Sequence, residues 1–399
     1  MNYWSFNLNI LLITYYFPPC GAIGSKRWGE FFDISQENKN ISFSVLTANW
    51  KGEKIDNENI HYLGDEQIYM PSASINKEYS ILDILLHPTI AIRSIDRSLF
   101  SKWLKDVKNW ISINRDKKFD YIISSYGPIA SIVAGSYAKK VFNVPLIVDL
   151  RDLISIQGQK KNIFGLNLFD KSFDKFITKD VDAFLTVSET CQKKAQSFYQ
   201  KNCHLIYNGF NNYFEEDENI NIDFKNKNSF KILYTGTLGK TRNPKTIMLI
   251  IDKYLKKNSN INIQVVFASQ DSPFDFIDKE DIKELKIKWL GYLSKDKLDE
   301  EKQSSDMFLL LEDLTEEGNE NLTGKIFEYI SSKKAIIASC NENSDIKKLL
   351  DKTKVGTLIS NENDFEDFIN TNLLWDIREI NFYSRKIQFE KFLKVLSNV

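Results

Sequence analysis

Short apolar runs alternate with longer amphipathic stretches along the whole chain. Many of the runs are unbroken rather than alternating in polarity, which is typical of parallel strands buried on both faces. The pattern predicts strands at 8–16, 41–47, 120–125, 145–149 and 183–187 in the first half. It predicts strands at 230–235, 262–267, 286–290, 307–311, 334–338 and 355–358 in the second half. This alternation of strands and helices favours an α/β fold with two doubly wound parallel sheets.

A polar stretch interrupts the pattern at Asn211–Asn228 and is the candidate linker. A chain of 399 residues is long enough for two domains with full cores. We therefore expect a Rossmann-like N-terminal domain over 1–208 and a Rossmann-like C-terminal domain over 209–375, facing each other across a cleft. Residues 376–399 are expected to form a helix that packs back on the N-terminal domain.

Composition narrows the class of protein. The net charge of −1 divides into +4 over residues 1–207 and −5 over the rest, so neither half has the basic excess of a nucleic-acid binder. Four cysteines and three histidines lie far apart without metal-type spacing, which favours a reduced cytosol and argues against zinc. The apolar run 10–17 follows no cationic segment and ends at Pro18, so a buried strand is favoured over a signal peptide. We expect a cytoplasmic protein.

Two carboxylates, Glu320 and Glu328, flank a turn and a helix start that follow a buried strand. We expect this helix to begin near Thr323, so that the backbone at Gly324 and Lys325 presents free N–H groups and the positive end of the helix dipole. Lys325 adds a cation, which suits a phosphorylated ligand. Glu328 falls about one turn into the helix, where its carboxylate can accept hydrogen bonds from the vicinal hydroxyls of a ribose. The junction therefore predicts a nucleotide-sugar pocket.

A second candidate loop follows the strand 230–235 and contains Gly236, Gly239, Lys240 and Arg242. Glycines followed by cations ahead of a helix suit a diphosphate, because glycine admits close backbone approach and arginine binds phosphate bidentately. A solvated basic loop is the alternative. Another strand ends at Gly291 and Tyr292, whose main-chain groups are candidates for holding the base; an ordinary strand end is the alternative.

In the first half, Gly21 and Gly24 follow the first strand and precede a helix start. They suit the approach of an anion, although a plain tight turn explains them equally well. Asp149, Arg151 and Asp152 follow another buried strand. Charges at that position are costly unless they are paired or functional. A carboxylate–arginine pair that braces the domain is therefore the alternative to a functional role.

For two further patterns a structural role is favoured over a functional one. Asp180 and Asp182 form an Asp-x-Asp motif of the kind that can bind a metal, but they precede a strand instead of following one. Capping and solvation are therefore favoured, and no metal site is predicted. Residues 100–111 have one apolar helical face, which we expect to pack on the N-terminal sheet, with an interfacial membrane helix as the alternative. The stretch 85–97 leaves peripheral contact with a membrane as an alternative.

Several segments together resemble retaining GT-B glycosyltransferases of family 4. They are YYFPPCGAIGSKR, PLIVDLRD, FLTVSE, IYNGF, YTGTLGKTRNP and GKIFEYISSKKAIIAS, and their order and spacing match the family. The resemblance implies a nucleotide diphosphate sugar, UDP- or GDP-linked, held mainly by the C-terminal domain. By position it implies that Glu328 binds the ribose, Glu320 the donor sugar hydroxyls and Arg242 the diphosphate. The Gly21 loop is then expected to approach the sugar-phosphate from the other domain.

The chain also departs from this family. Thr237 replaces a common arginine, so the second phosphate cation is expected to be Lys325, with Lys240 as the second choice. Arg151 stands where the family often has a histidine beside the reacting sugar. Retaining members lack a well-placed protein nucleophile, so front-face attack by the acceptor hydroxyl is implied and metal-independent activity is expected.

The leading hypothesis is transfer of a hexosyl-type group to a growing surface glycan, on a lipid carrier at the cytoplasmic membrane face. The sequence leaves the donor sugar, the acceptor and the oligomeric state undefined. One alternative is a GT-B-fold sugar-nucleotide epimerase, although the scarcity of histidine argues against it. Another is a non-catalytic nucleotide-sugar-binding subunit, which the Thr237 departure keeps open.

Overall fold

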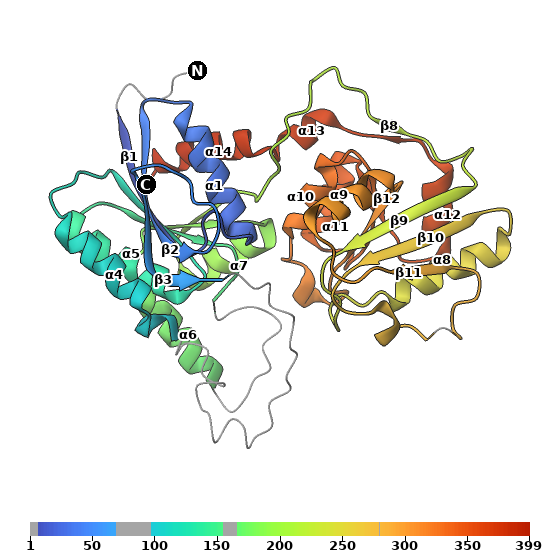
Figure 1. Cartoon of the computed structure of the whole chain (residues 1–399), viewed down its shortest axis with the longest axis horizontal. Coiled ribbons are helices and arrows are strands. Elements are labelled where there is room, and N and C mark those ends of the chain that lie inside the picture. The colour runs from blue at the N-terminus through green and yellow to red at the C-terminus, as the bar shows by residue number, and fades with distance from the viewer. Residues whose placement is uncertain (1–6, 69–96, 155–165, 279) are drawn as a thin grey trace. The chain divides into compact units, whose positions relative to one another are not determined.

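The computed structural model describes residues 7–68, 97–154, 166–278 and 280–399, which divide into two compact units (Figure 1). The first unit comprises the described residues up to Asn208 together with Arg385–Val399. The second comprises Gly209–Ser384. The expected α/β class with two Rossmann-like parallel sheets is confirmed.

The sheet of the first unit is parallel throughout its described strands, in the order β3-β2-β1-β4-β5-β6-β7. Its strands are β1 Leu8–Thr14, β2 Ile41–Trp50, β3 Ile60–Gln67, β4 Tyr121–Ser125, β5 Leu146–Leu150, β6 Ala183–Thr186 and β7 Asn202–Leu205. Its helices are α1 Ile23–Gln36, η1 Arg97–Phe100, α4 Lys102–Ile113, α5 Ile129–Phe142, α6 Leu166–Ile177, α7 Glu189–Tyr199 and α14 Arg385–Leu396.

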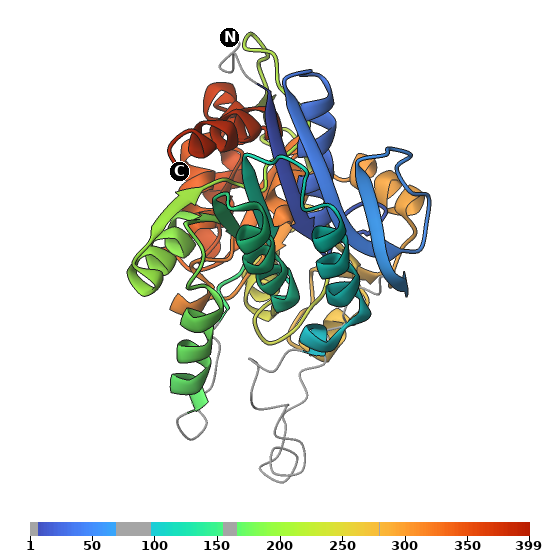
Figure 2. The ribbon, with the colours of Figure 1, turned by 90° about the vertical axis from the view of Figure 1, so that its left-hand side faces the viewer.

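Helices cover both faces of this sheet (Figure 2). On one face α1 and α14 meet through aromatic rings, with Trp28 5.6 Å from Phe392 and Phe31 5.3 Å from Phe389 between ring centroids. On the other face α4 and α5 pack side by side. Burial on both faces explains why these strands are apolar without alternation.

The apolar face of α4 is part of the core. Trp103, Leu104, Val107 and Ile111 are each at most 5% exposed. The expectation that this helix packs on the sheet is confirmed, and an interfacial role for this face is wrong. The stretch 85–96, which kept membrane contact open, lies outside the described residues. Within the described ranges, no helix has both the length and the apolar character needed to cross a membrane.

The second unit repeats the architecture with a parallel sheet in the order β11-β10-β9-β12-β13-β14. Its strands are β9 Ser229–Thr235, β10 Asn262–Ala268, β11 Lys286–Trp289, β12 Met307–Leu311, β13 Ala335–Ser339 and β14 Gly356–Leu358. Its helices are α8 Lys245–Lys257, η2 Pro273–Asp275, α9 Lys295–Ser304, η3 Glu316–Gly318, α10 Gly324–Ser331, α11 Asp345–Thr353, α12 Glu362–Asn370 and α13 Ile377–Asn381.

The segment Asn211–Asn228 is not a free linker, which corrects the sequence interpretation. Its Phe214 and Phe224 are buried, and β8 Asn221–Ile222 pairs antiparallel with β15 Leu373–Leu374. Two buried aromatic side chains anchor this largely polar stretch within the second unit, to which it belongs.

The C-terminal boundary also differs from the expected one at residue 375. Residues 376–384, including α13, belong to the second unit, and the first unit resumes at Arg385. A contact within the second unit explains this. The Asn381 side chain accepts a hydrogen bond from the backbone N–H of Phe214 and donates one to the Phe214 carbonyl. Only α14 therefore belongs with the N-terminal sheet.

Candidate functional site

The strand order of the second sheet reverses between β9 and β12, which are hydrogen-bonded neighbours. Ligands of open parallel sheets bind outside the carboxyl ends of the strands at such a switch point. The segment after β9 carries Gly236 and Arg242, and the segment after β12 leads into α10. The topology alone therefore brings the two predicted phosphate-binding segments to one edge of the sheet.

The glycine loop after β9 is fixed by its own hydrogen bonds. The Gly236 N–H donates to a carbonyl at the end of β10 at 3.2 Å, and the Leu238 N–H donates to Asp271 Oδ2 at 3.0 Å. Gly239 and Arg242 exchange backbone hydrogen bonds across a tight turn. The amides of Gly236 and Gly239 are therefore already hydrogen-bonded within the chain, and the expected approach of a diphosphate to these glycines stays a prediction. The loop holds Arg242 in a defined place.

Gly236 is needed for a different reason. Its φ of +121° is a conformation that residues with a side chain rarely adopt. A Cβ at this position would collide with Nζ and Cε of Lys325. The glycine therefore makes room for the ammonium group of α10.

The ammonium nitrogen of Lys325 is buried, although the residue as a whole is half-buried. Its Nζ has no hydrogen-bond partner within the described part of the chain and lies 5.1 Å from the centroid of the Tyr234 ring. Burial, and then the positive charge of Arg242, lower the pKa of Lys325 to about 8, against partial compensation by Glu312 and Glu328. An unpaired buried ammonium is costly in a folded protein. The arrangement therefore suits an anionic ligand that supplies the missing partner.

Arg242 is paired with Glu312, the residue that follows β12. Its Nε and Nη2 each lie 3.2 Å from Oε1 of Glu312, whose side chain is only 2% exposed. Burial raises the pKa of Glu312, although Arg242 and then Lys325 oppose the shift. Glu312 was missed from the sequence. The available signal was a carboxylate at the end of an apolar strand, a position similar to that of Asp149 near the end of β5.

The helix α10 begins as predicted, with Thr323 as its N-cap and Gly324 as its first residue. Thr323 makes no side-chain cap, so the first-turn N–H groups have no capping side chain. Such a helix end attracts anions. The structure thus brings together Arg242, Lys325, Gly236 and the start of α10, as the sequence predicted.

The two predicted carboxylates of this segment have different surroundings. Glu328 is 41% exposed and is paired through Oε1 with Lys302 of α9. Glu320 is half-buried in the turn between η3 and α10. Their roles toward a ribose and a donor sugar stay predictions, and a ribose would meet a Glu328 that already has a cationic neighbour.

Three other predicted residues lie on the surface of the second unit. Lys240 is exposed, and Tyr292 is 78% exposed. Gly291 has a φ of +69° with open space where a Cβ would stand. Their roles toward the base and the phosphates stay predictions.

In the first unit the strand order reverses between β1 and β4, and the Gly21 loop follows β1. Arg151, which follows β5, donates from Nη2 to the Tyr126 carbonyl at 3.1 Å. A Cβ on Gly24 would collide with the Arg151 guanidinium, so this glycine provides space for a side chain as Gly236 does. Gly21 itself is exposed. Roles of Gly21, Gly24 and Arg151 toward a sugar stay predictions.

Asp149 is a bracing residue. It forms a fully buried ion pair with Arg27 of α1 and accepts hydrogen bonds from Trp28 Nε1 at 2.9 Å and Ser125 Oγ at 3.1 Å. Arg27 also donates to the Ile206 carbonyl at 3.2 Å. The bracing alternative therefore holds for Asp149, with Arg27 as its partner and not Arg151.

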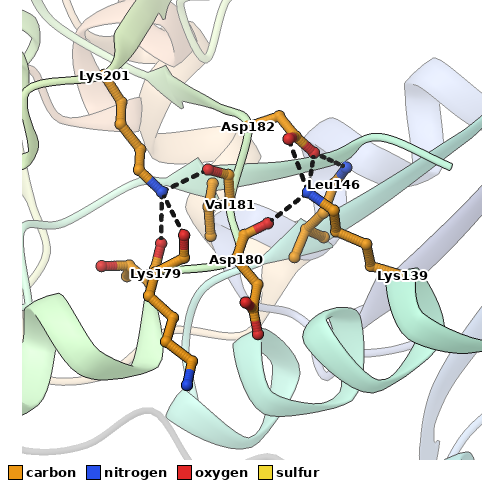
Figure 3. Close-up of polar contacts among 8 residues, drawn as sticks. Lys139, Leu146, Lys179, Asp180, Val181, Asp182 and Lys201 are labelled. Atoms are coloured by element: carbon orange, nitrogen blue, oxygen red, sulfur yellow. Dashed lines mark hydrogen bonds and ion pairs between the residues drawn. The ribbon is translucent and has the colours of Figure 1, made fainter. Parts of the chain in front are cut away.

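The Asp-x-Asp motif is structural (Figure 3). Asp182 accepts from the Leu146 N–H at 2.7 Å and pairs with Lys139 at 2.7 Å. Beside it, Lys201 donates to the carbonyls of Lys179 at 2.8 Å and Val181 at 2.6 Å. Capping of β5 and of the turn after α6 explains the motif. Across the described residues no group of three His, Cys, Asp or Glu side chains is placed to hold a metal ion.

Comparison with known proteins places this geometry in context. Residues 215–373 match the family model described as glycosyl transferases group 1. The match lies within the second unit and contains Arg242, Lys325 and both predicted carboxylates. No curated protein matches the chain by sequence.

Solved structures share the fold over the full length. A glycosyltransferase from Rickettsia africae ESF-5 is 14% identical, with a TM-score of 0.59, and the similarity covers 98% of each chain. Sucrose-phosphate synthase from Thermosynechococcus elongatus is 11% identical, with a TM-score of 0.58 over 98% of this chain and 99% of that one. Anabaena Alr3699/HepE, solved in complex with UDP-glucose, is 13% identical, with a TM-score of 0.53 over 98% and 100%. At these identities the likeness establishes the GT-B fold.

Replacing Gly236 by alanine tests whether this glycine makes room for Lys325. The Cβ displaces the ammonium, and the positive φ adds strain of roughly 1–3 kcal/mol. We expect Gly236→Ala to lose at least tenfold in nucleotide affinity by calorimetry. Gly291→Ala is the control for backbone strain, because Gly291 has a positive φ but free space at the Cβ position. Only the free energy of unfolding is compared between the two variants, since Gly291 is itself a candidate for holding the base. Equal nucleotide affinity in Gly236→Ala and the wild type would contradict this assignment.

Proposed function

We propose that this chain is a retaining, metal-independent glycosyltransferase of family 4. It transfers a hexosyl-type group from a UDP- or GDP-linked sugar to a hydroxyl of a glycan or lipid-linked acceptor. The proposal places the reaction in surface polysaccharide biosynthesis on the cytoplasmic side of the membrane. The observation that carries it is the buried, unpartnered ammonium of Lys325 beside Arg242 at the start of α10.

Breaking the bond between the sugar and the diphosphate leaves negative charge on the leaving group. Arg242, Lys325 and the first-turn amides of α10 are held in place before any ligand arrives, so they stabilise that charge without reorganisation. The hydrogen-bonded turn at Gly239 fixes Arg242 on its loop. Lys325 is fixed by its contact with the Tyr234 ring and by the space at Gly236.

The remaining roles follow the same proposal. Glu328 would bind the ribose, and Glu320 the donor sugar. Gly291 and Tyr292 would hold the base, and Arg151 with the Gly21 loop would act toward the transferred sugar. Anabaena Alr3699/HepE was solved with UDP-glucose, which makes UDP the first nucleotide to test.

Nucleotide binding gives the first test. A ligand that binds only the folded state stabilises it by about 2.7 kcal/mol at 100 times its Kd. We expect UDP or GDP, but not CMP, to raise the Tm of the full chain by several degrees in a thermal-shift assay. Lys325→Gln should abolish the shift. Lys253→Gln, on the exposed side of α8, is the matched lysine control and should keep it. Equal shifts in the wild type and Lys325→Gln would contradict the proposed site.

Turnover separates the proposal from its alternatives. A panel of nucleotide sugars is incubated with the chain, and nucleotide release is followed with Glu328→Ala as the control. Slow release without acceptor supports a transferase. Interconversion of the sugar without release supports an epimerase, and binding without either reaction supports a non-catalytic subunit.

A further inference from the structure

Glu312 has no role in the site as proposed so far, yet its position is tightly defined. Its backbone N–H donates to the Ser339 carbonyl at 3.0 Å, so the chain still follows β13 at this point. Its carboxylate oxygen Oε1 lies 3.2 Å from both Nε and Nη2 of Arg242. The side chain is fixed at its base by the sheet and at its tip by a cation.

Lys325 is surrounded by charged groups from several elements. Arg242 acts on it from the glycine loop, Glu312 from the end of β12, and Glu328 from its own helix. The Tyr234 ring of β9 lies against the ammonium. Glu328 is already paired with a lysine of α9. Glu312 is therefore the buried carboxylate that balances the two cations of the site.

We propose that Glu312 is a positioning residue for diphosphate binding. It orients Arg242 in the empty site and places a negative charge near Lys325. When the donor binds, Arg242 exchanges Glu312 for diphosphate oxygens, and Lys325 gains the partner that it lacks. The inference rests on the proposed function, since it concerns the same site. In this proposal Glu312 acts only through Arg242 and Lys325 and does not contact the reacting sugar.

The geometry has a measurable consequence. Opposite charge near a buried ammonium favours its protonated form. Without the Glu312 carboxylate, Lys325 faces Arg242 with less compensation and loses its proton at lower pH. A neutral lysine binds a diphosphate weakly. Nucleotide affinity should therefore fall with rising pH in every form of the chain, but at a lower pH when Glu312 is neutralised.

The experiment measures the Kd of UDP or GDP by calorimetry on the full chain from pH 7 to 9.5. In this range the terminal phosphate, whose second pKa is about 6, is largely dianionic. Ionisation of the base at the alkaline end is the same for all variants, so the comparison between variants is unaffected. For the wild type we expect the affinity to fall above about pH 8, the pKa of Lys325. For Glu312→Gln we expect the fall to begin at a lower pH, because the carboxylate that favours the protonated lysine is gone.

Two further variants make the result specific. Glu312→Asp keeps the charge but withdraws it from Arg242, so a smaller shift in the same direction is expected, and it serves as the test if Glu312→Gln does not fold. Asp252→Asn is the matched control, because this buried carboxylate caps the backbone at 283–285 away from the site. Its pH profile should equal that of the wild type.

Each outcome decides one question. An unchanged pH profile in the folded Glu312 variants, with nucleotide binding intact, overturns the role of Glu312 and leaves the proposed function standing. A shift in Asp252→Asn of the same size also overturns it, because general destabilisation would then explain the effect. If neither UDP nor GDP binds the wild type at any pH, the proposed function itself fails.

Discussion

Replacing Lys325 by methionine is expected to stabilise the second unit while abolishing nucleotide binding. Methionine fills a similar volume without the buried, unpartnered charge. The lowering of the Lys325 pKa from 10.5 to about 8 corresponds to a cost of roughly 3 kcal/mol in the folded state. This cost is already net of the attraction between Lys325 and Glu312. We expect a net increase of about 2 kcal/mol in the free energy of unfolding at pH 7.

The pH dependence of this effect has a defined sign. The folded-state pKa of Lys325 lies below its unfolded value, so the unfolded chain binds more protons between about pH 8 and 10.5. Stability of the wild type therefore gains a contribution as pH rises through this window, and the full cost is present below it. Lys325→Met lacks that contribution. Denaturant unfolding at pH 7 and pH 10 measures both effects.

Lys302→Met is the control for the loss of a lysine as such. Lys302 is also largely buried but is paired with Glu328, so its removal should not stabilise the chain. If Lys325→Met is less stable than the wild type and still binds UDP or GDP, the interpretation of Lys325 as a ligand-binding cation is wrong. A stabilising loss of function is the signature of a residue kept for binding rather than for folding.

The parallel core of both units could be predicted from the sequence, because burial on two faces gives unbroken apolar runs. The edge strands of the first sheet could not. β3 is half-exposed and contains Gly64, Asp65 and Glu66, so its composition resembles a loop. β7 is a four-residue strand at the opposite edge. Edge strands bury only part of their surface, and the apolar signal weakens accordingly.

The candidate site shows the same division between local and tertiary information. Lys325 and Gly236 were predicted because each lies in a short segment whose residues carry the pattern. Glu312 was missed because its partner Arg242 lies 70 positions away, and no local motif joins them. The hydrogen bonds within the glycine loop could not be predicted for a related reason. A glycine pattern shows that close approach is allowed, but not whether a ligand or another part of the chain uses it.

Breaking the buried pair of Arg27 and Asp149 is expected to have the largest destabilising effect in the first unit. Both side chains are fully buried, so Asp149→Ala leaves an uncompensated guanidinium in the core. It also removes the acceptor of Trp28 Nε1 and Ser125 Oγ. Removing one partner of such a pair costs about 3–5 kcal/mol. We expect the free energy of unfolding, measured with denaturant, to fall by that amount.

Two comparisons make this prediction specific to the pair. Asp152→Ala removes a nearby but exposed carboxylate and should change stability by no more than about 0.5 kcal/mol. The double variant Arg27→Met with Asp149→Leu removes both charges, and replacing a buried pair by apolar residues is often neutral or stabilising. It should therefore be more stable than Asp149→Ala alone. If Asp149→Ala unfolds like the wild type, Asp149 does not brace the unit, and a functional role for this carboxylate has to be reconsidered.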